Sequence, residues 1–312
     1  DMIKQLLPDS IQSIINETPP SLIHKLEEIR IRVNRPLELI VEGKPYYPIK
    51  NNQRHIVTMA ESVHFMNKLS NFSLYAFEEE LKRGYITIRG GHRVGLAGKV
   101  TIEQGKVKAI KEIGSYNIRI AREKIGVVEN YIPYLYENRW LNTLIIGAPQ
   151  TGKTTLLRDM ARTISKGNHR YRIASQKVAI VDERSEIAGS VKGVPQHQLG
   201  DRVDVLDACP KAEGMMMMIR SMSPDVIIVD EIGRQEDCDA IIEALNAGVQ
   251  MMMTVHANSL EDLYLRPMLK MILEGNVFER FIELTRHEAP GVVKKIRDRY
   301  GKTLFEYKDW ER

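Results

Sequence analysis

Short apolar runs and longer helical patterns alternate along the second half of the chain. Four runs have the length of buried strands: 144–146, 178–181, 226–229 and roughly 249–254. After the first of them, apolar residues recur with the spacing of one helix face at Leu156, Leu157, Met160, Ala161 and Ile164. This alternation predicts an α/β domain with a largely parallel sheet and helices on both faces.

The first 125 residues follow a different pattern. Residues 26–43 alternate apolar and charged positions as a half-buried strand pair does, with a turn at 34–36. A helix is predicted after Thr58, whose position three residues before Glu61 predicts a capping box. Glycines divide residues 84–110 into short predicted strands.

These patterns predict three parts of the chain. A smaller α+β domain is expected over residues 1–125, a linker over 126–137 and the α/β domain over 138–312.

Composition narrows the class of protein. The chain of 312 residues is 43% hydrophobic and 28% charged, which is ordinary for a soluble globular protein. Its net charge is only +4, so its basic and acidic residues nearly balance. A protein that coats nucleic acid would be more basic, so no nucleic-acid partner is expected. Cys209 and Cys238 lack the spacing of metal ligands and favour a reducing cytoplasm. The chain shows no signal peptide and no apolar run of about 18 residues, so any membrane contact is expected to depend on partners.

The sequence GAPQTGKT at 147–154 has the pattern of a phosphate-binding P-loop, or Walker A motif, between a predicted strand and a predicted helix. The glycines permit close backbone approach, and the backbone amides from about Gln150 to Thr155 are expected to surround phosphate oxygens. Lys153 is expected to reach the β- and γ-phosphates, and Thr154 to join the Mg²⁺ shell. The predicted ATP-binding residues of the loop are Gly147, Ala148, Pro149, Gln150, Thr151, Gly152, Lys153, Thr154 and Thr155.

Two predicted strands end in an Asp-Glu pair, and a nucleotide-hydrolysing site needs one such pair. The pair Asp230-Glu231 follows a fully apolar run, which favours Asp230 as the metal-side acid and Glu231 as the residue that orients water. A later strand carries Thr254 and His256, which are candidates for sensing the γ-phosphate.

The other pair, Asp182-Glu183, is followed by a third acid, Glu186. Two interpretations stay open for it. It is either a solvated strand end or an auxiliary acidic box beside the phosphate site, where it would polarise water or tie the sheet edge to the N-terminal domain.

The order of these motifs resembles the secretion ATPases of type II and type IV systems. Within that group, the segments GAPQTGKTTLLRD, VDERSEIAGSVKG, DVLDACPKAEGMMMMIRSMSPDVIIVDEIGR and NAGVQMMMTVHANS resemble the stage III sporulation protein AA family from about Glu28 to Val292. One departure is that the broader secretion pattern has Gly-Glu at the second strand end, whereas this chain has Asp-Glu.

The resemblance implies a RecA-like P-loop ATPase that uses ATP and Mg²⁺ and assembles as a homo-hexameric ring. It implies a place in the mother-cell cytoplasm, where the ring energises membrane proteins of a channel between mother cell and forespore. It also implies catalytic roles for Glu231, Glu183, Glu186 and His256, and metal contacts for Thr154 and Asp230. By the same resemblance, arginines of the N-terminal domain approach the nucleotide, and the residues in the comparable place are Arg93, Arg119 and Arg122.

Three other functions are weighed against this motor. A P-loop kinase is disfavoured because the histidine and acidic boxes suit water activation and no acceptor lid is apparent. A nucleotide-binding scaffold that switches assembly with little turnover is opposed by the complete set of hydrolytic residues. A nucleic-acid-dependent ATPase has weak support from the basic, glycine-rich stretch between Lys82 and Lys124.

Overall fold

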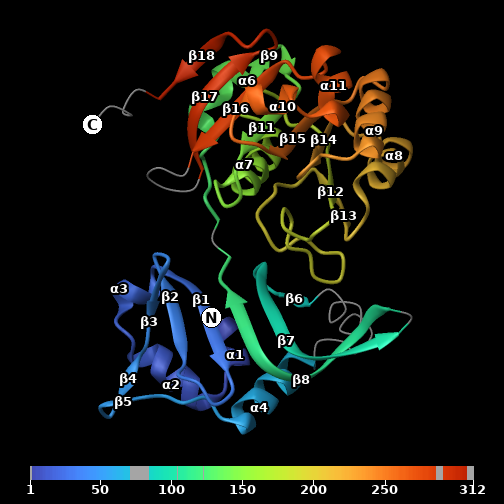
Figure 1. Ribbon diagram of the computed structural model, residues 1–312. Coiled ribbons are helices and arrows are strands. Elements are labelled where there is room, and N and C mark those ends of the chain that lie inside the picture. The colour runs from blue at the N-terminus through green and yellow to red at the C-terminus, as the bar shows by residue number, and fades with distance from the viewer. Residues whose placement is uncertain (1, 71–83, 104, 122, 286–290, 308–312) are drawn as a thin grey trace. The chain divides into compact units, whose positions relative to one another are not determined.

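A computed structural model describes residues 2–70, 84–103, 105–121, 123–285 and 291–307 (Figure 1). The chain divides into two compact units, Asp1–Arg122 and Glu123–Arg312. Within the described residues, no helix combines the length and the apolar character needed to cross a bilayer.

The first unit is built on a six-stranded antiparallel sheet. In sheet order its strands are β3 (Lys44–Tyr46), β2 (Glu38–Val41), β1 (Leu26–Arg32), β8 (Lys106–Arg119), β7 (His92–Glu103) and β6 (Tyr85–Ile88). The other elements among the described residues of this unit are α1 (Met2–Leu6), α2 (Asp9–Glu17), α3 (Pro20–Ile23), α4 (Met59–Ser70) and the hairpin β4 (Ile49–Lys50) and β5 (Gln53–Arg54). The core lies where buried strand residues such as Ile29 and Ile118 meet buried helix residues such as Ile11 and Phe65.

Two local predictions in this unit are confirmed. Strands β1 and β2 pair across a turn in which Asn34 has a φ of 59°. Helix α4 begins with the capping box, because the Glu61 carboxylate accepts from the Thr58 amide (2.7 Å) and the Thr58 hydroxyl accepts from the Glu61 amide (3.2 Å).

The prediction of short strands over 84–110 is correct for β6, which has four residues and is followed by Gly90 and Gly91, and wrong for the rest of the segment. Strands β7 and β8 have 12 and 14 residues and pair along most of their length. At Gly98 the register shifts, and a Cβ atom there would lie 2.7 Å from the carbonyl oxygens of Lys111 and Glu112. The glycine therefore permits a bulge within a long strand and does not end it.

The second unit contains an eight-stranded sheet. In sheet order its strands are β13 (Val203–Asp207), β12 (Val178–Asp182), β14 (Val226–Val229), β15 (Gln250–His256), β11 (Thr143–Gly147), β16 (Arg280–Thr285), β17 (Val292–Asp298) and β18 (Thr303–Glu306). The first six are parallel to one another, and β17 and β18 add an antiparallel edge. The predicted largely parallel sheet is confirmed.

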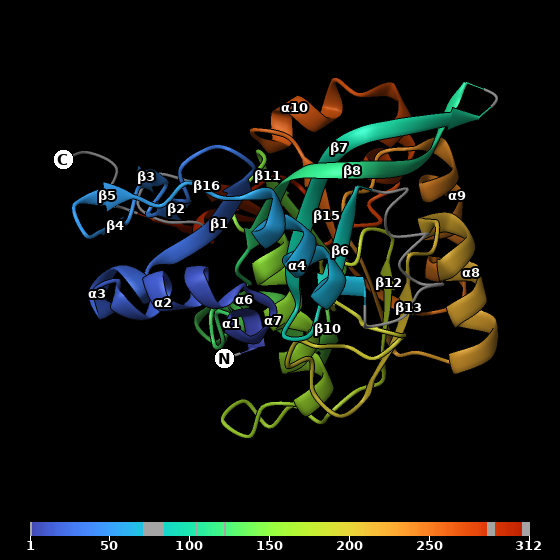
Figure 2. The same cartoon turned by 90° about the horizontal axis from the view of Figure 1, so that it is seen from below.

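Helices cover both faces of this sheet, as predicted. On one face Ile180 and Ile228 pack with the apolar stripe of α7 (Lys153–Lys166). On the other face Val181 and Val229 pack with α8 (Lys211–Met222) and α9 (Gln235–Asn246), which lie side by side in Figures 1 and 2. Three short helices follow β15: α10 (Leu260–Tyr264), η2 (Pro267–Leu269) and α11 (Lys270–Glu274).

The segment predicted as a linker, 126–137, folds as part of the second unit. It forms η1 (Glu129–Tyr131), α6 (Ile132–Leu135) and β9 (Tyr136–Glu137), and β9 pairs with β10 (Arg139–Trp140). Val128, Ile132 and Leu135 are buried in the same core as α7. Because these apolar side chains bury so completely, the boundary between the two units falls earlier, after residue 122.

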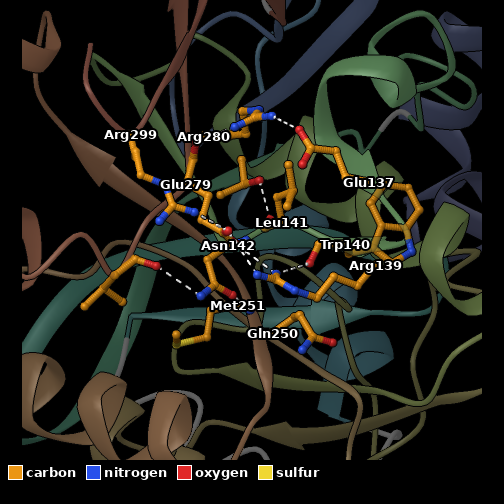
Figure 3. Close-up of polar contacts among 12 residues, drawn as sticks. Glu137, Arg139, Trp140, Leu141, Asn142, Gln250, Met251, Glu279, Arg280 and Arg299 are labelled. Atoms are coloured by element: carbon orange, nitrogen blue, oxygen red, sulfur yellow. Dashed lines mark hydrogen bonds and ion pairs between the residues drawn. The ribbon is translucent and has the colours of Figure 1, made fainter. Parts of the chain in front are cut away.

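A polar network joins the amino ends of the central strands (Figure 3). The buried Glu279 carboxylate accepts from Arg139 (2.8 and 3.0 Å), from the Asn142 amide (3.1 Å) and from Arg299 (2.6 Å). The Asn142 side chain accepts from the Met251 amide (3.0 Å) on β15. These bonds fix β11, β15 and β16 relative to one another at the edge where the strands begin.

Candidate nucleotide-binding site

The predicted P-loop connects β11 to α7. A Cβ atom on Gly147 would lie 2.4 Å from the Thr151 hydroxyl, so only glycine fits there without displacing the loop. Gly152 has a φ of 91° and Gln150 a φ of 64°, which give the loop its tight turn. The Thr151 hydroxyl closes the turn by donating to the Ala148 carbonyl (2.8 Å). Pro149 and Gln150 lie exposed on the loop, and Thr155 lies in the first turn of α7.

The amino end of α7 suits phosphate oxygens. The first amides of a helix have no intrahelical acceptor, and in the described part of the chain no side chain caps this helix. Partial positive charge collects at such a terminus. Together with the close backbone approach at Gly147, this fits the phosphates of a nucleotide.

Lys153 extends along the inside of the loop and is 5% exposed. Its ammonium donates to the carbonyls of Gly147 (2.8 Å) and Ala148 (3.0 Å) and contacts His256 Nδ1 at 3.0 Å. An ammonium has three N–H donors, so these contacts use all of them. Burial lowers the pKa of Lys153, and the nearby charges of Asp230 and Glu231 oppose that effect.

Thr154 and Asp230 meet beside the loop. The Thr154 hydroxyl donates to Asp230 Oδ2 at 2.7 Å, and Thr254 on β15 donates to Oδ1 of the same carboxylate. Burial raises the pKa of Asp230, and the two hydroxyl bonds oppose it.

A hydroxyl and a carboxylate are ligands that Mg²⁺ accepts alongside substrate phosphates and waters. Among the described residues, no group of three or more His, Cys, Asp or Glu side chains is arranged to hold a metal. The donor set of Thr154 and Asp230 therefore fits an ion that a nucleotide would share.

Glu231 follows Asp230 with a φ of 55°, and its amide donates to the Thr254 hydroxyl at 2.8 Å. One carboxylate oxygen contacts His256 Nε2 (2.8 Å) and the other accepts from Arg184 Nη1 (2.8 Å). Because the Lys153 ammonium can only donate, His256 Nδ1 is the acceptor in their contact. The ring proton then lies on Nε2, which donates to Glu231.

The first acidic pair has a different environment. Asp182 is 2% exposed, and its carboxylate accepts from the amides of Glu186 (2.8 Å), Ile187 (3.0 Å) and Ala188 (2.8 Å). Burial raises the pKa of Asp182 to about 6, against the effect of these bonds. Arg158 donates to the Ile187 and Glu186 carbonyls (2.7 Å each). Asp182 therefore shapes its own loop and is not a solvated strand end.

The two other acids of this loop lie on one cavity with the second pair. Glu183 forms an ion pair with Lys211 of α8. Burial lowers the pKa of Lys153 and raises that of Asp230, and the charge of Glu186 opposes the first effect and adds to the second. The cavity is lined by Asp182, Glu183, Arg184, Glu186, Lys211, Asp230 and Glu231. The structure thus brings together the acids of both strands.

The predicted arginines belong to the first unit. Arg93 on β7 lies over the Tyr85 ring, with its guanidinium carbon 3.8 Å from the ring centroid. Arg119 ends β8, lies opposite Arg93 in the strand register and is 3.8 Å from the Glu28 carboxylate. Arg122 lies outside the described residues.

Sequence reasoning missed three basic residues around the acids: Arg158, Arg184 and Lys211. Arg184 stands inside the segment DERSE and Arg158 inside TTLLRD, so each was adjacent to a recognised motif. Arg158 contacts Glu186 and Ile187, Arg184 contacts Glu231 and Lys211 contacts Glu183, and only the packed loops reveal these contacts.

The fold and the P-loop define a RecA-like α/β protein of the kind found in secretion and pilus ATPases. The ATPase DotB of Legionella pneumophila has a TM-score of 0.60 at 17% identity, over 88% of this chain and 75% of that chain. The pilus retraction motor PilT with bound ADP has a TM-score of 0.58 at 13% identity, over 93% of this chain and 82% of that chain. At these identities the likeness shows the fold.

The family follows from sequence. Residues 1–304 match the family described as sporulation stage III, protein AA, and the chain belongs to that family. It is 55% identical over 303 residues to stage III sporulation protein AA of Bacillus subtilis (strain 168), covering 97% of this chain and 96% of the relative. The resemblance seen in the motifs is confirmed.

Proposed function

We propose that this protein is a Mg²⁺-dependent ATPase that forms a homo-oligomeric ring and energises a secretion-like channel complex during endospore formation. The observation that carries the proposal is one connected set of contacts. Thr154 of the P-loop bonds to Asp230, and Lys153 of the same loop is linked through His256 to Glu231. Phosphate-binding and water-orienting groups therefore meet at one edge of the sheet.

The residues divide the work of hydrolysis. The P-loop amides and Lys153 bind the phosphates, and Glu231 orients a water molecule toward the γ-phosphorus. The water oxygen bonds to phosphorus, the bond to the β–γ bridging oxygen breaks, and the water proton passes through Glu231 to solvent. His256 fixes the Glu231 carboxylate through Nε2.

Thr154 and Asp230 would hold Mg²⁺, which supplies charge neutralisation of the phosphates when bound. Glu183 and Glu186 act as the auxiliary acidic box on the same cavity. Of the two, Glu186 has the stronger support, because its charge acts on Lys153 and Asp230, whereas Glu183 is paired with Lys211.

The biological setting rests on the family. Membership of the sporulation stage III AA family supports a role in endospore formation. The fold shared with the ATPase DotB and the pilus retraction motor PilT supports an ATP-driven motor. The proposed hexameric ring, acting from the mother-cell cytoplasm on membrane partners, extends the resemblance to the sporulation family. In such a ring, Arg93, Arg119 and Arg122 would approach a nucleotide.

Phosphate release measured against protein concentration, Mg²⁺ and added DNA tests the proposal. We expect turnover that requires Mg²⁺, rises with protein concentration as rings form, and does not respond to DNA. Salt-sensitive activation by DNA would instead favour a nucleic-acid-dependent ATPase. Tight ATP binding with no turnover at any concentration would favour a switching scaffold.

A further inference from the structure

The carboxylate that orients water is engaged on both oxygens. Glu231 Oε1 accepts from His256 and Oε2 accepts from Arg184, each at 2.8 Å. Each carboxylate oxygen that already accepts from a side chain leaves less room for an attacking water molecule to donate to it. Hydrolysis is therefore favoured when one of these donors moves to another acceptor.

Of the two donors, Arg184 is the more exposed to solvent. Its side chain is 62% exposed, against 40% for His256. An ion pair this exposed stabilises only weakly. His256 is also bonded to Lys153 through its other ring nitrogen, which restrains the ring.

The backbone that carries Arg184 is firmly fixed. Asp182 accepts three amides from the loop immediately after Arg184, and Arg158 donates to two of its carbonyls. Ser185, the next residue, donates its hydroxyl to Asp207 (2.5 Å). An exposed side chain on a fixed backbone can change its contact while its point of attachment stays in place, as a charge-stabilising arginine requires.

The other basic groups nearby are bonded to groups other than Glu231. Lys211 is paired with Glu183 and its side chain is 9% exposed. Arg158 uses its Nε and Nη2 donors on backbone carbonyls. Arg184 lines the same cavity as Lys211, but it contacts Glu231 and is connected through Glu231 and His256 to Lys153.

We infer that Arg184 is a catalytic residue that leaves Glu231 and contacts the γ-phosphate oxygens when a nucleoside triphosphate binds. This movement frees the Glu231 carboxylate. In its new position the guanidinium stabilises the charge that develops on the transferring phosphoryl group. The inference rests on the proposed function. Five acids line the cavity, so a triphosphate needs cationic groups beyond Lys153, and a guanidinium forks onto phosphate oxygens with paired donors. A diphosphate lacks the group that Arg184 would contact, so Arg184 also distinguishes ATP from ADP.

Binding and turnover of Arg184→Ala, compared with the wild-type full chain, test this inference. We expect the Kd for ADP to stay within about twofold and the Kd for a β,γ-imido ATP analogue to rise about tenfold. The hydrolysis rate is expected to fall by a factor on the order of 10²–10³, somewhat below the range of arginine fingers. Arg184→Lys is expected to recover affinity for the analogue while staying at least about tenfold slow, because an ammonium lacks the planar fork. Arg170→Ala, at an exposed arginine outside the cavity, is the matched control.

Two results would overturn the inference alone, given active wild-type protein. Turnover of Arg184→Ala equal to or faster than wild type would make Arg184 only a restraint on Glu231. An equal loss of ADP and analogue affinity would mean that it shapes the whole site. An inactive wild-type protein would instead overturn the proposed function, and this inference with it.

Discussion

The Thr154 hydroxyl lies 2.7 Å from the Asp230 carboxylate, although the two residues are 76 positions apart in sequence. This bond joins the first turn of α7 to the end of β14. It places the two proposed Mg²⁺ ligands side by side, one from the P-loop and one from the acidic strand end.

Replacing Thr154 tests that pairing. Thr154→Ala removes a proposed metal ligand, so we expect the Mg²⁺ concentration for half-maximal hydrolysis to rise about tenfold or more. Thr154→Ser keeps the hydroxyl and is expected to stay near wild type. A Mg²⁺ titration of hydrolysis compares the two variants, and coincident midpoints for alanine and serine would remove Thr154 from the metal site.

His256 is expected to act through Glu231. His256→Gln loses the ring that bridges Lys153 and Glu231, so we expect kcat to fall by roughly 10–100-fold. Nucleotide affinity is expected to change less than about threefold, because the P-loop amides are intact. Stopped-flow binding and steady-state turnover separate the two effects, with His169→Gln as an exposed control. A large loss of affinity with normal kcat would instead place His256 among the binding residues.

Glu279 is expected to stabilise the second unit in a pH-dependent way. Burial alone would raise its pKa, but the bonds from Arg139 and the Asn142 amide, with the charge of Arg299, lower it. A carboxyl whose folded-state pKa is depressed stabilises the fold above its unfolded-state pKa of about 4.3 and loses that contribution as pH falls through the folded value.

Glu279→Gln should therefore lower the free energy of unfolding by about 2 kcal/mol at pH 7, with a smaller difference below about pH 4. Urea denaturation at several pH values measures this difference in the free energy of unfolding. Glu137→Gln in the same network is the control, because that side chain is 66% exposed and its ion pair with Arg280 is expected to contribute under about 1 kcal/mol. An unchanged difference at low pH would show that the charge of Glu279 is not what stabilises the network.

The sequence predicted the parts of the site that local rules determine. The P-loop follows from glycine positions and the start of a helix. Strands β12 and β14 follow from apolar runs, so the predicted ends of these two strands lie close to the observed ends. Residues 126–137 were mistaken for a linker because the burial of Val128 and Ile132 depends on α7, which is distant in sequence.

The roles of the acids depended on packing in the same way. Asp182 and Asp230 have nearly identical local sequences, yet one accepts the amides of its own loop and the other accepts the hydroxyls of Thr154 and Thr254. Arg184 stands beside a recognised motif, but its contact gave no signal in sequence, because its partner Glu231 lies 47 residues away.

The central claim is that the second acidic pair, and not the first, carries out hydrolysis. Single-turnover hydrolysis of bound ATP by Glu231→Gln and Glu183→Gln tests it most directly, because both changes remove one charge from the same cavity. We predict that Glu231→Gln binds ATP and hydrolyses it slower by a factor on the order of 10²–10⁴, whereas Glu183→Gln loses at most about tenfold. Wild-type single-turnover rates in Glu231→Gln, or a larger loss in Glu183→Gln, would contradict the account.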